Sequence, residues 1–193
     1  MNSVERAIER NPYALYKSHK ENIELVLSKI YKTGDFTLSS GKKSDFYIDC
    51  KEVILGNYGL TETLYVINLL KFSSNCIAGV TSGADPLVCG YITKYSASYG
   101  LFKRNEKKSY GTKKLIEGKF NEGDSVVIVD DVLTTGGSIK YAFDILVKHN
   151  LKPIQIIVVV DRQENKAAEE IKSYTGLNVY AITNKESLIK IKW

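Results

Sequence analysis

Two adjacent carboxylates, Asp130 and Asp131, are followed by two threonines, two glycines and a serine in the order DDVLTTGGS. An apolar run, Val126–Val129, precedes them and a helical stretch follows, which predicts a strand, a short loop and a helix. Backbone N–H groups at a helix start are unpaired and lie at the positive end of the helix dipole. The loop Thr134–Ser138 is therefore expected to bind a phosphate group, with its hydroxyl groups as further donors.

The two acids indicate that the rest of the ligand is a sugar. Carboxylates repel a phosphate, but they accept hydrogen bonds well from neutral hydroxyl groups. A ribose phosphate meets both conditions, with its phosphate in the loop and its hydroxyls on Asp130 and Asp131. Negative charge beside the ribose would also stabilise an oxocarbenium ion, as group transfer at the anomeric carbon requires. A plain helix cap would account for the threonines, serine and glycines but not for the paired acids.

The elements that must position this loop are strands and helices in alternation. The expected strands are 76–80, 99–103, 125–129, 154–160 and 177–182, and the expected helices between them are 86–95, 138–149 and 166–174. Continuous apolar strands are buried on both faces, which predicts a mainly parallel sheet flanked by helices. Ligands of such sheets bind at the C-terminal ends of the strands, which is where the acids lie.

The N-terminal part of the chain has a different pattern. We expect a helix from Pro12 to about Lys32 that Gly34 caps, a hairpin within 36–51, and a helix over 60–71. The 193 residues suit a single domain with a hydrophobic core. The whole chain, 1–193, is therefore expected to fold as one unit.

Composition narrows the class of protein. A net charge of +5 suits an anionic small molecule as well as a nucleic acid. The three cysteines match no metal or redox spacing, and two histidines make a histidine-rich metal site improbable. No apolar stretch is long enough to cross a bilayer, and the N-terminus has no apolar signal core. The expected location is cytoplasmic.

The string VVIVDDVLTTGGSI resembles the motif of type I phosphoribosyltransferases, which bind phosphoribosyl diphosphate (PRPP). Four further segments resemble orotate phosphoribosyltransferases in the right order: a hood at 36–55, a diphosphate loop at 79–87, a mobile loop at 104–118 and a strand end, VVVDRQE, at 158–164. The resemblance implies the type I phosphoribosyltransferase fold, a central mainly parallel sheet flanked by helices. It also implies a small N-terminal hood, contributed mainly by 1–55, on a core of 56–193.

The resemblance implies roles for the matched residues. PRPP would be bound by Ser82, Gly83, Ala84, Asp85, Arg104, Asn105, Lys108, Tyr110, Asp130, Asp131, Val132, Leu133, Thr134, Thr135, Gly136, Gly137 and Ser138. The catalytic residues among them would be Arg104, Lys108, Asp130 and Asp131. Mg²⁺ would be held mainly by substrate oxygens and water, with Asp131 close to it through water.

Orotate would be bound by Thr134, Arg162 and Tyr47, with the planar Arg162 guanidinium on the substrate carboxylate. Either Phe46 or Tyr47 would stack on the pyrimidine ring. Strand residues alternate between faces, so at least one of these two rings is expected to pack in the core instead.

The loop departs from the family pattern at two positions. Asn105 stands where the family usually has lysine, and Tyr110 stands where it usually has histidine. One cation is lost, and so is the side chain that titrates near neutral pH. The resemblance still implies that 104–114 closes as a lid and, in a homodimer, reaches the neighbouring site.

The expected activity is therefore that of an orotate phosphoribosyltransferase, a pentosyltransferase of UMP biosynthesis that converts orotate and PRPP to orotidine 5′-monophosphate and diphosphate. Two alternatives remain open at this point. One is transfer to another base, such as a purine, which would leave Arg162 without a carboxylate partner. The other is a regulatory protein that binds PRPP without turnover, as the altered loop would allow. The expected partners include neither nucleic acid nor a membrane.

Overall fold

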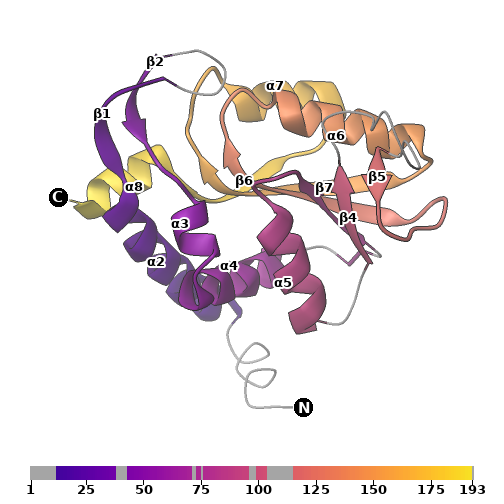
Figure 1. The fold of residues 1–193 in the computed structure, drawn as a ribbon, viewed down its shortest axis with the longest axis horizontal. Coiled ribbons are helices and arrows are strands. Elements are labelled where there is room, and N and C mark those ends of the chain that lie inside the picture. Colours follow the sequence, from indigo (N-terminus) through magenta and orange to yellow (C-terminus); the bar gives the residue numbers. More distant parts are fainter. Residues whose placement is uncertain are drawn as a thin grey trace.

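Figure 1 shows a computed structural model of the chain, which describes residues 12–37, 43–70, 73–74, 76–95, 99–103 and 115–192. A six-stranded sheet with the order β5-β4-β3-β6-β7-β8 forms its centre. The parallel strands are β3 (Cys76–Val80), β4 (Tyr99–Lys103), β6 (Ser125–Leu133), β7 (Lys152–Asp161) and β8 (Val179–Asn184). The edge strand β5 (Ile116–Glu117) pairs antiparallel with β4. The predicted mainly parallel sheet is confirmed.

Helices cover both faces of the sheet (Figure 1). One face carries α2 (Pro12–Ile30), α4 (Asn57–Leu70), α5 (Asp85–Tyr95) and α8 (Lys185–Lys192), and the other carries α6 (Gly137–Lys148) and α7 (Ala167–Thr175). Within β6, Val127 and Val129 pack in the first core, whereas Val126 and Ile128 pack in the second. This two-sided burial is why the strand sequences are continuously apolar.

A separate antiparallel hairpin consists of β1 (Lys32–Thr37) and β2 (Lys43–Tyr47), and the short helix α3 (Lys51–Ile54) follows it. A hairpin is present as predicted, but it spans 32–47 and so begins before the predicted range of 36–51. The first helix begins at Pro12 as predicted, but its predicted end is wrong. The helix ends at Ile30, and Gly34 lies inside β1 at a shift in strand register instead of capping the helix. Glycine in a strand commonly marks such an irregularity.

The sheet topology selects one place for a ligand. From β3 the chain runs through α5 to β4 on one side, and from β6 it runs through α6 to β7 on the other side. In open α/β sheets, a crevice forms at such a reversal, beyond the C-terminal ends of the strands. The crevice expected here therefore lies between the loops that follow β3 and β6.

Two C-terminal features differ from the prediction. β6 runs to Leu133 instead of ending at Val129, because Asp130, Val132 and Leu133 continue to pair with β7. Asp130 and Asp131 therefore belong to the end of a strand, where the backbone is held rigidly. Helix α8 was not predicted at all. Among the described residues, no helix is long and apolar enough to cross a membrane.

Candidate active site

The loop after β6 forms a small hollow at the start of α6. A cavity of about 30 Å³ is lined by Asp130, by Val132–Ser138 and by Ile139, so all of Thr134–Ser138 lines it. About 10–15 Å³ accommodates one water molecule, which makes this cavity the size of a phosphate group and too small for a nucleobase. Unpaired N–H groups at the α6 N-terminus favour an anion there. The geometry suits the predicted phosphate-binding loop.

Gly136, the N-cap of α6, has a left-handed backbone with φ 74°. A Cβ at this position would lie 2.9 Å from two side-chain carbons of Ile171 on α7. Backbone strain and overlap both act against any larger residue, so we expect Gly136→Ala to lower the free energy of unfolding by about 1–3 kcal/mol. Urea unfolding would measure the change.

Gly137→Ala is the matched control for Gly136→Ala. A Cβ at Gly137 would meet only Thr135 Oγ1, at an ordinary 3.8 Å. Equal losses in the free energy of unfolding of the two variants would show that the close packing between Gly136 and Ile171 does not contribute to stability.

Backbone hydrogen bonds fix the two acids. The Asp131 N–H donates to Asp130 Oδ1 at 2.9 Å, and the Val132 N–H donates to Asp131 Oδ1 at 3.0 Å. Asp130 is buried and Asp131 is partly buried. Their carboxylates are therefore held beside the phosphate-sized cavity without rearrangement.

The loop after β3 lies directly against Asp131. A Cβ added at Gly83 would overlap with the Asp131 carboxylate, so only glycine allows this approach. The Thr81–Ser82 peptide bond in the same loop is cis. The predicted diphosphate loop, which also contains Ala84, and the predicted ribose-binding acids are thus brought together beyond the C-terminal ends of the adjacent strands β3 and β6.

This loop also contains polar atoms without partners. Thr81 Oγ1 and Asp85 Oδ1 are buried and accept or donate no hydrogen bond within the described part of the chain. Burial raises the pKa of the Asp85 carboxyl, and the nearby Lys51 ammonium lowers it. Buried polar atoms of this kind normally have a partner, so the loop has spare capacity for a polar ligand or its water.

The segment between the hairpin and α3 lies near the acid pair. Burial raises the pKa of the Cys50 thiol well above its ordinary value, and the carboxylates of Asp131, Asp49 and Asp130 raise it further. Arg162 acts in the opposite direction. The two acids are therefore close enough to Cys50 for their negative charge to act on its thiol.

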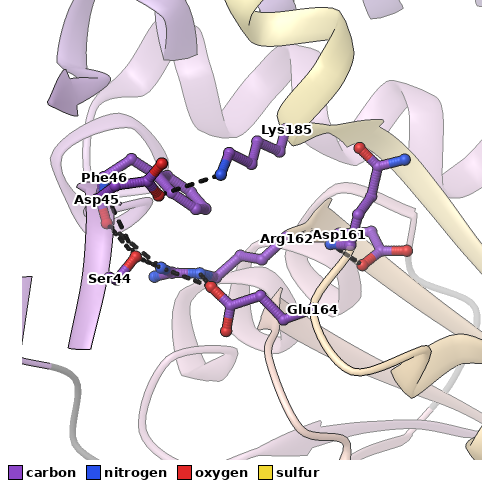
Figure 2. Close-up of polar contacts among 8 residues, drawn as sticks. Ser44, Asp45, Phe46, Asp161, Arg162, Glu164 and Lys185 are labelled. Carbon is purple, nitrogen blue, oxygen red and sulfur yellow. Dashed lines mark hydrogen bonds and ion pairs between the residues drawn. The ribbon is translucent and has the colours of Figure 1, made fainter. Parts of the chain in front are cut away.

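Arg162 follows β7 and points toward the hairpin (Figure 2). It is 3% exposed, and its guanidinium lies 4.1 Å from the centre of the Phe46 ring. Its Nη2 donates to Ser44 Oγ at 2.7 Å and to the Phe46 carbonyl at 3.3 Å. Its Nε donates to Glu164 Oε1 at 3.0 Å. The predicted orotate-binding arginine is thus built into the contact between sheet and hood.

Lys185, at the start of α8, lies beside the candidate site, although no motif in the sequence points to it. Its Nζ lies 4.1 Å from the Phe46 ring centre and 3.2 Å from Asp45 Oδ1 (Figure 2). The hydrogen bond to Lys185 lowers the pKa of the Asp45 carboxyl. The sequence contained one indication of its location. Lys185 immediately follows β8, and the C-terminal end of that strand lies at the same sheet edge as the other site residues.

Tyr47 lies elsewhere. Phe46 is 1% exposed and contacts Arg162, whereas Tyr47 is 36% exposed and stacks on Phe36 with a ring distance of 5.5 Å. Successive strand residues point to opposite faces, so only one of these rings can face the sheet. The structure brings Phe46 to the arginine and leaves Tyr47 on the other face of the hairpin. Arg104, Asn105, Lys108 and Tyr110 lie outside the described residues.

Comparison with known proteins identifies the family. The phosphoribosyl transferase domain model matches residues 76–192. An orotate phosphoribosyltransferase from Pyrococcus horikoshii is 36% identical over 90% of this chain and 95% of its own length. One from Methanothermobacter thermautotrophicus is 38% identical over 79% and 84%. The crystal structure of the Aeropyrum pernix orotate phosphoribosyltransferase superposes with a TM-score of 0.75 at 27% identity, covering 88% of this chain and 97% of that one. The chain therefore belongs to the phosphoribosyl transferase family, and within it to the orotate phosphoribosyltransferases.

Proposed function

We propose that this protein transfers the phosphoribosyl group of PRPP to orotate, giving orotidine 5′-monophosphate and diphosphate, a step of pyrimidine biosynthesis. The contact between Gly83 and Asp131 carries the proposal. It joins a phosphate-sized cavity, a pair of acids and a second glycine-containing loop at the topological switch point of the sheet. PRPP has a matching set of groups: a 5′-phosphate, ribose hydroxyls and a diphosphate.

In this mechanism the chain mainly binds, orients and stabilises charge. Thr134–Ser138 hold the 5′-phosphate, and Asp130 and Asp131 accept hydrogen bonds from the ribose hydroxyls. The loop Ser82–Asp85 holds the diphosphate. The bond to diphosphate breaks ahead of attack by orotate N1, so positive charge develops on the ribose beside the acids.

Arg162 supports orotate as the acceptor. It provides a planar cation next to the aromatic ring of Phe46, and a pyrimidine carboxylate pairs well with such a donor. Thr134, which lines the phosphate cavity, would be a second contact for orotate. A neutral purine offers no partner for the arginine.

Mg²⁺ belongs to the same proposal. Among the described residues no group of three or more acids, histidines and cysteines is placed to hold a metal by itself. Asp131 is partly buried beside the second loop, and a single carboxylate there fits an ion that substrate oxygens and water would mainly hold, with Asp131 close to it through water. When bound, Mg²⁺ would neutralise charge on the departing diphosphate.

Two further parts of the proposal involve the loop 104–114 and a second subunit. We propose that Arg104 and Lys108 of the loop 104–114 close over the diphosphate, with Asn105 and Tyr110 altering its detailed chemistry. We also propose a homodimer in which this loop serves the neighbouring site. A cytoplasmic location stays a prediction of the sequence.

Diphosphate release tests the function directly. Purified protein is incubated with PRPP and Mg²⁺, with and without orotate, and the ultraviolet absorbance of orotate is followed in parallel. Orotate-dependent release of diphosphate with matching loss of absorbance is expected. Release with a purine instead would contradict the assigned acceptor, and PRPP binding without any turnover would favour a regulatory role.

A further inference from the structure

Glu164 forms an ion pair with Arg162. Arg162 Nη2 and Nε each lie 3.0 Å from Glu164 Oε1, so one carboxylate oxygen meets both donors (Figure 2). We propose that Glu164 is a positioning residue which pairs with Arg162 before an acidic base binds, and that the carboxylate of the base displaces it. This inference rests on the proposed function of Arg162.

The hydrogen bonds of the guanidinium show why the two carboxylates compete. A guanidinium presents five N–H donors, and a bidentate carboxylate needs two that lie on one edge. The edge formed by Nε and Nη2 is taken by Glu164, and Nη2 also serves Ser44 and the Phe46 carbonyl. Within the described residues, no hydrogen bond is formed by Nη1. A bidentate substrate carboxylate therefore requires at least one of the present acceptors to leave.

Glu164 is the acceptor that can leave at the lowest cost. Its side chain is 23% exposed, compared with 3% for Arg162, so a displaced Glu164 carboxylate has access to water. The Phe46 carbonyl belongs to the strand β2 and cannot turn away independently. Ser44 Oγ is also fixed, because it donates to the Phe46 carbonyl at 2.9 Å.

The exchange keeps the buried cation paired throughout. A buried charge left without a partner is strongly destabilising, and Glu164 prevents this in the free protein. An acidic base replaces one carboxylate with another, whereas a neutral base cannot displace Glu164 with any gain. Because the base must displace Glu164, its affinity is lower than it would be for an Arg162 that had no carboxylate partner.

Replacing Glu164 by glutamine tests the competition. A neutral amide keeps the size and one acceptor oxygen but pairs with Arg162 less strongly than a carboxylate. We expect orotate to bind Glu164→Gln about 5-fold more tightly than the unchanged protein, as isothermal titration calorimetry would measure. The KM for orotate should fall by a similar factor, and the KM for PRPP should stay unchanged.

Two further variants make the test decisive. Glu164→Asp keeps the charge on a shorter side chain that reaches Arg162 less well, so this variant should also bind orotate more tightly. It provides a second test in case Glu164→Gln does not fold. Glu169→Gln removes the same charge from an exposed position on α7 and should leave orotate binding unchanged. Equal or weaker orotate binding in Glu164→Gln and Glu164→Asp would overturn the proposal and show that Glu164 supports Arg162 during binding.

Failure of the Glu164 proposal can be distinguished from failure of the proposed function. Absence of orotate-dependent diphosphate release in the unchanged protein would contradict the function, whatever the variants bind. Turnover by the unchanged protein, together with weaker orotate binding by both Glu164 variants, would contradict only the competition between carboxylates.

Discussion

Asp131→Asn is expected to lower kcat about 100-fold, the usual order of loss when one preorganised electrostatic group is removed from an active site. Asparagine keeps the shape of the side chain that packs against Gly83, and its amide oxygen can still accept a hydrogen bond from the Val132 N–H or a ribose hydroxyl. Only the negative charge is lost. Because positive charge develops on the ribose in the transition state, kcat should fall far more than the affinity for PRPP.

Initial rates at saturating PRPP and orotate give kcat for this comparison. Asp144→Asn is the matched control, since it removes the same charge from α6, where Asp144 accepts hydrogen bonds from Tyr174 at 2.9 and 3.0 Å. The control should retain the original kcat. A loss in Asp131→Asn no greater than in Asp144→Asn would exclude electrostatic stabilisation by Asp131.

Gly83→Ala is expected to lower kcat/KM for PRPP about 100-fold, because a misplacement of roughly 1 Å in an active site can have this effect. The new methyl group would occupy the space of the Asp131 carboxylate, so either the diphosphate loop or the acid must move. Both belong to the PRPP site in our proposal. The free energy of unfolding should change little, because Asp131 is only partly buried and its side chain can move toward solvent.

Gly56→Ala provides the comparison for Gly83→Ala. A Cβ at Gly56, between α3 and α4, would come no closer than 3.4 Å to the Val53 carbonyl oxygen. Steady-state kinetics with varied PRPP and urea unfolding would be measured for both variants. Normal kcat/KM in Gly83→Ala would mean that the two loops do not need their present approach.

The parts of the fold that the sequence predicts correctly are those with a strong local cause. Strands buried on both faces need continuous apolar residues, so Ile154–Val160 was evident. The loop between β6 and α6 could be predicted because glycines and hydroxyl side chains directly after an apolar run favour the start of a helix. Both patterns span fewer than a dozen neighbouring residues and need no knowledge of the tertiary structure.

Other features depend on contacts that no local pattern contains. Asp130 and Asp131 are polar and seemed to belong to a loop, but backbone pairing with β7 extends the strand through them. The choice between Phe46 and Tyr47 depends on the register of one hairpin, where a shift by one residue exchanges the faces. The approach of Gly83 to Asp131 joins segments far apart in the chain.

Helix α8 was missed for a different reason. It has eight residues, KESLIKIK, and follows β8 without an intervening loop. A stretch of two helical turns is too short for its periodicity to be distinguished from a strand. Its first residue, Lys185, contacts Phe46 and Asp45, so the missed element also concealed a neighbour of the candidate site.

The contacts between the hairpin and Arg162 have a thermodynamic consequence. The hairpin residues Ser44 and Phe46 are held by the same guanidinium that we assign to the base. Order in the hairpin and occupancy of the arginine are then coupled equilibria, and coupling of this kind is reciprocal. If the bound base raises the equilibrium constant for hairpin docking by some factor, hairpin docking must raise the affinity for the base by the same factor. The hood is then part of the binding equilibrium for the pyrimidine.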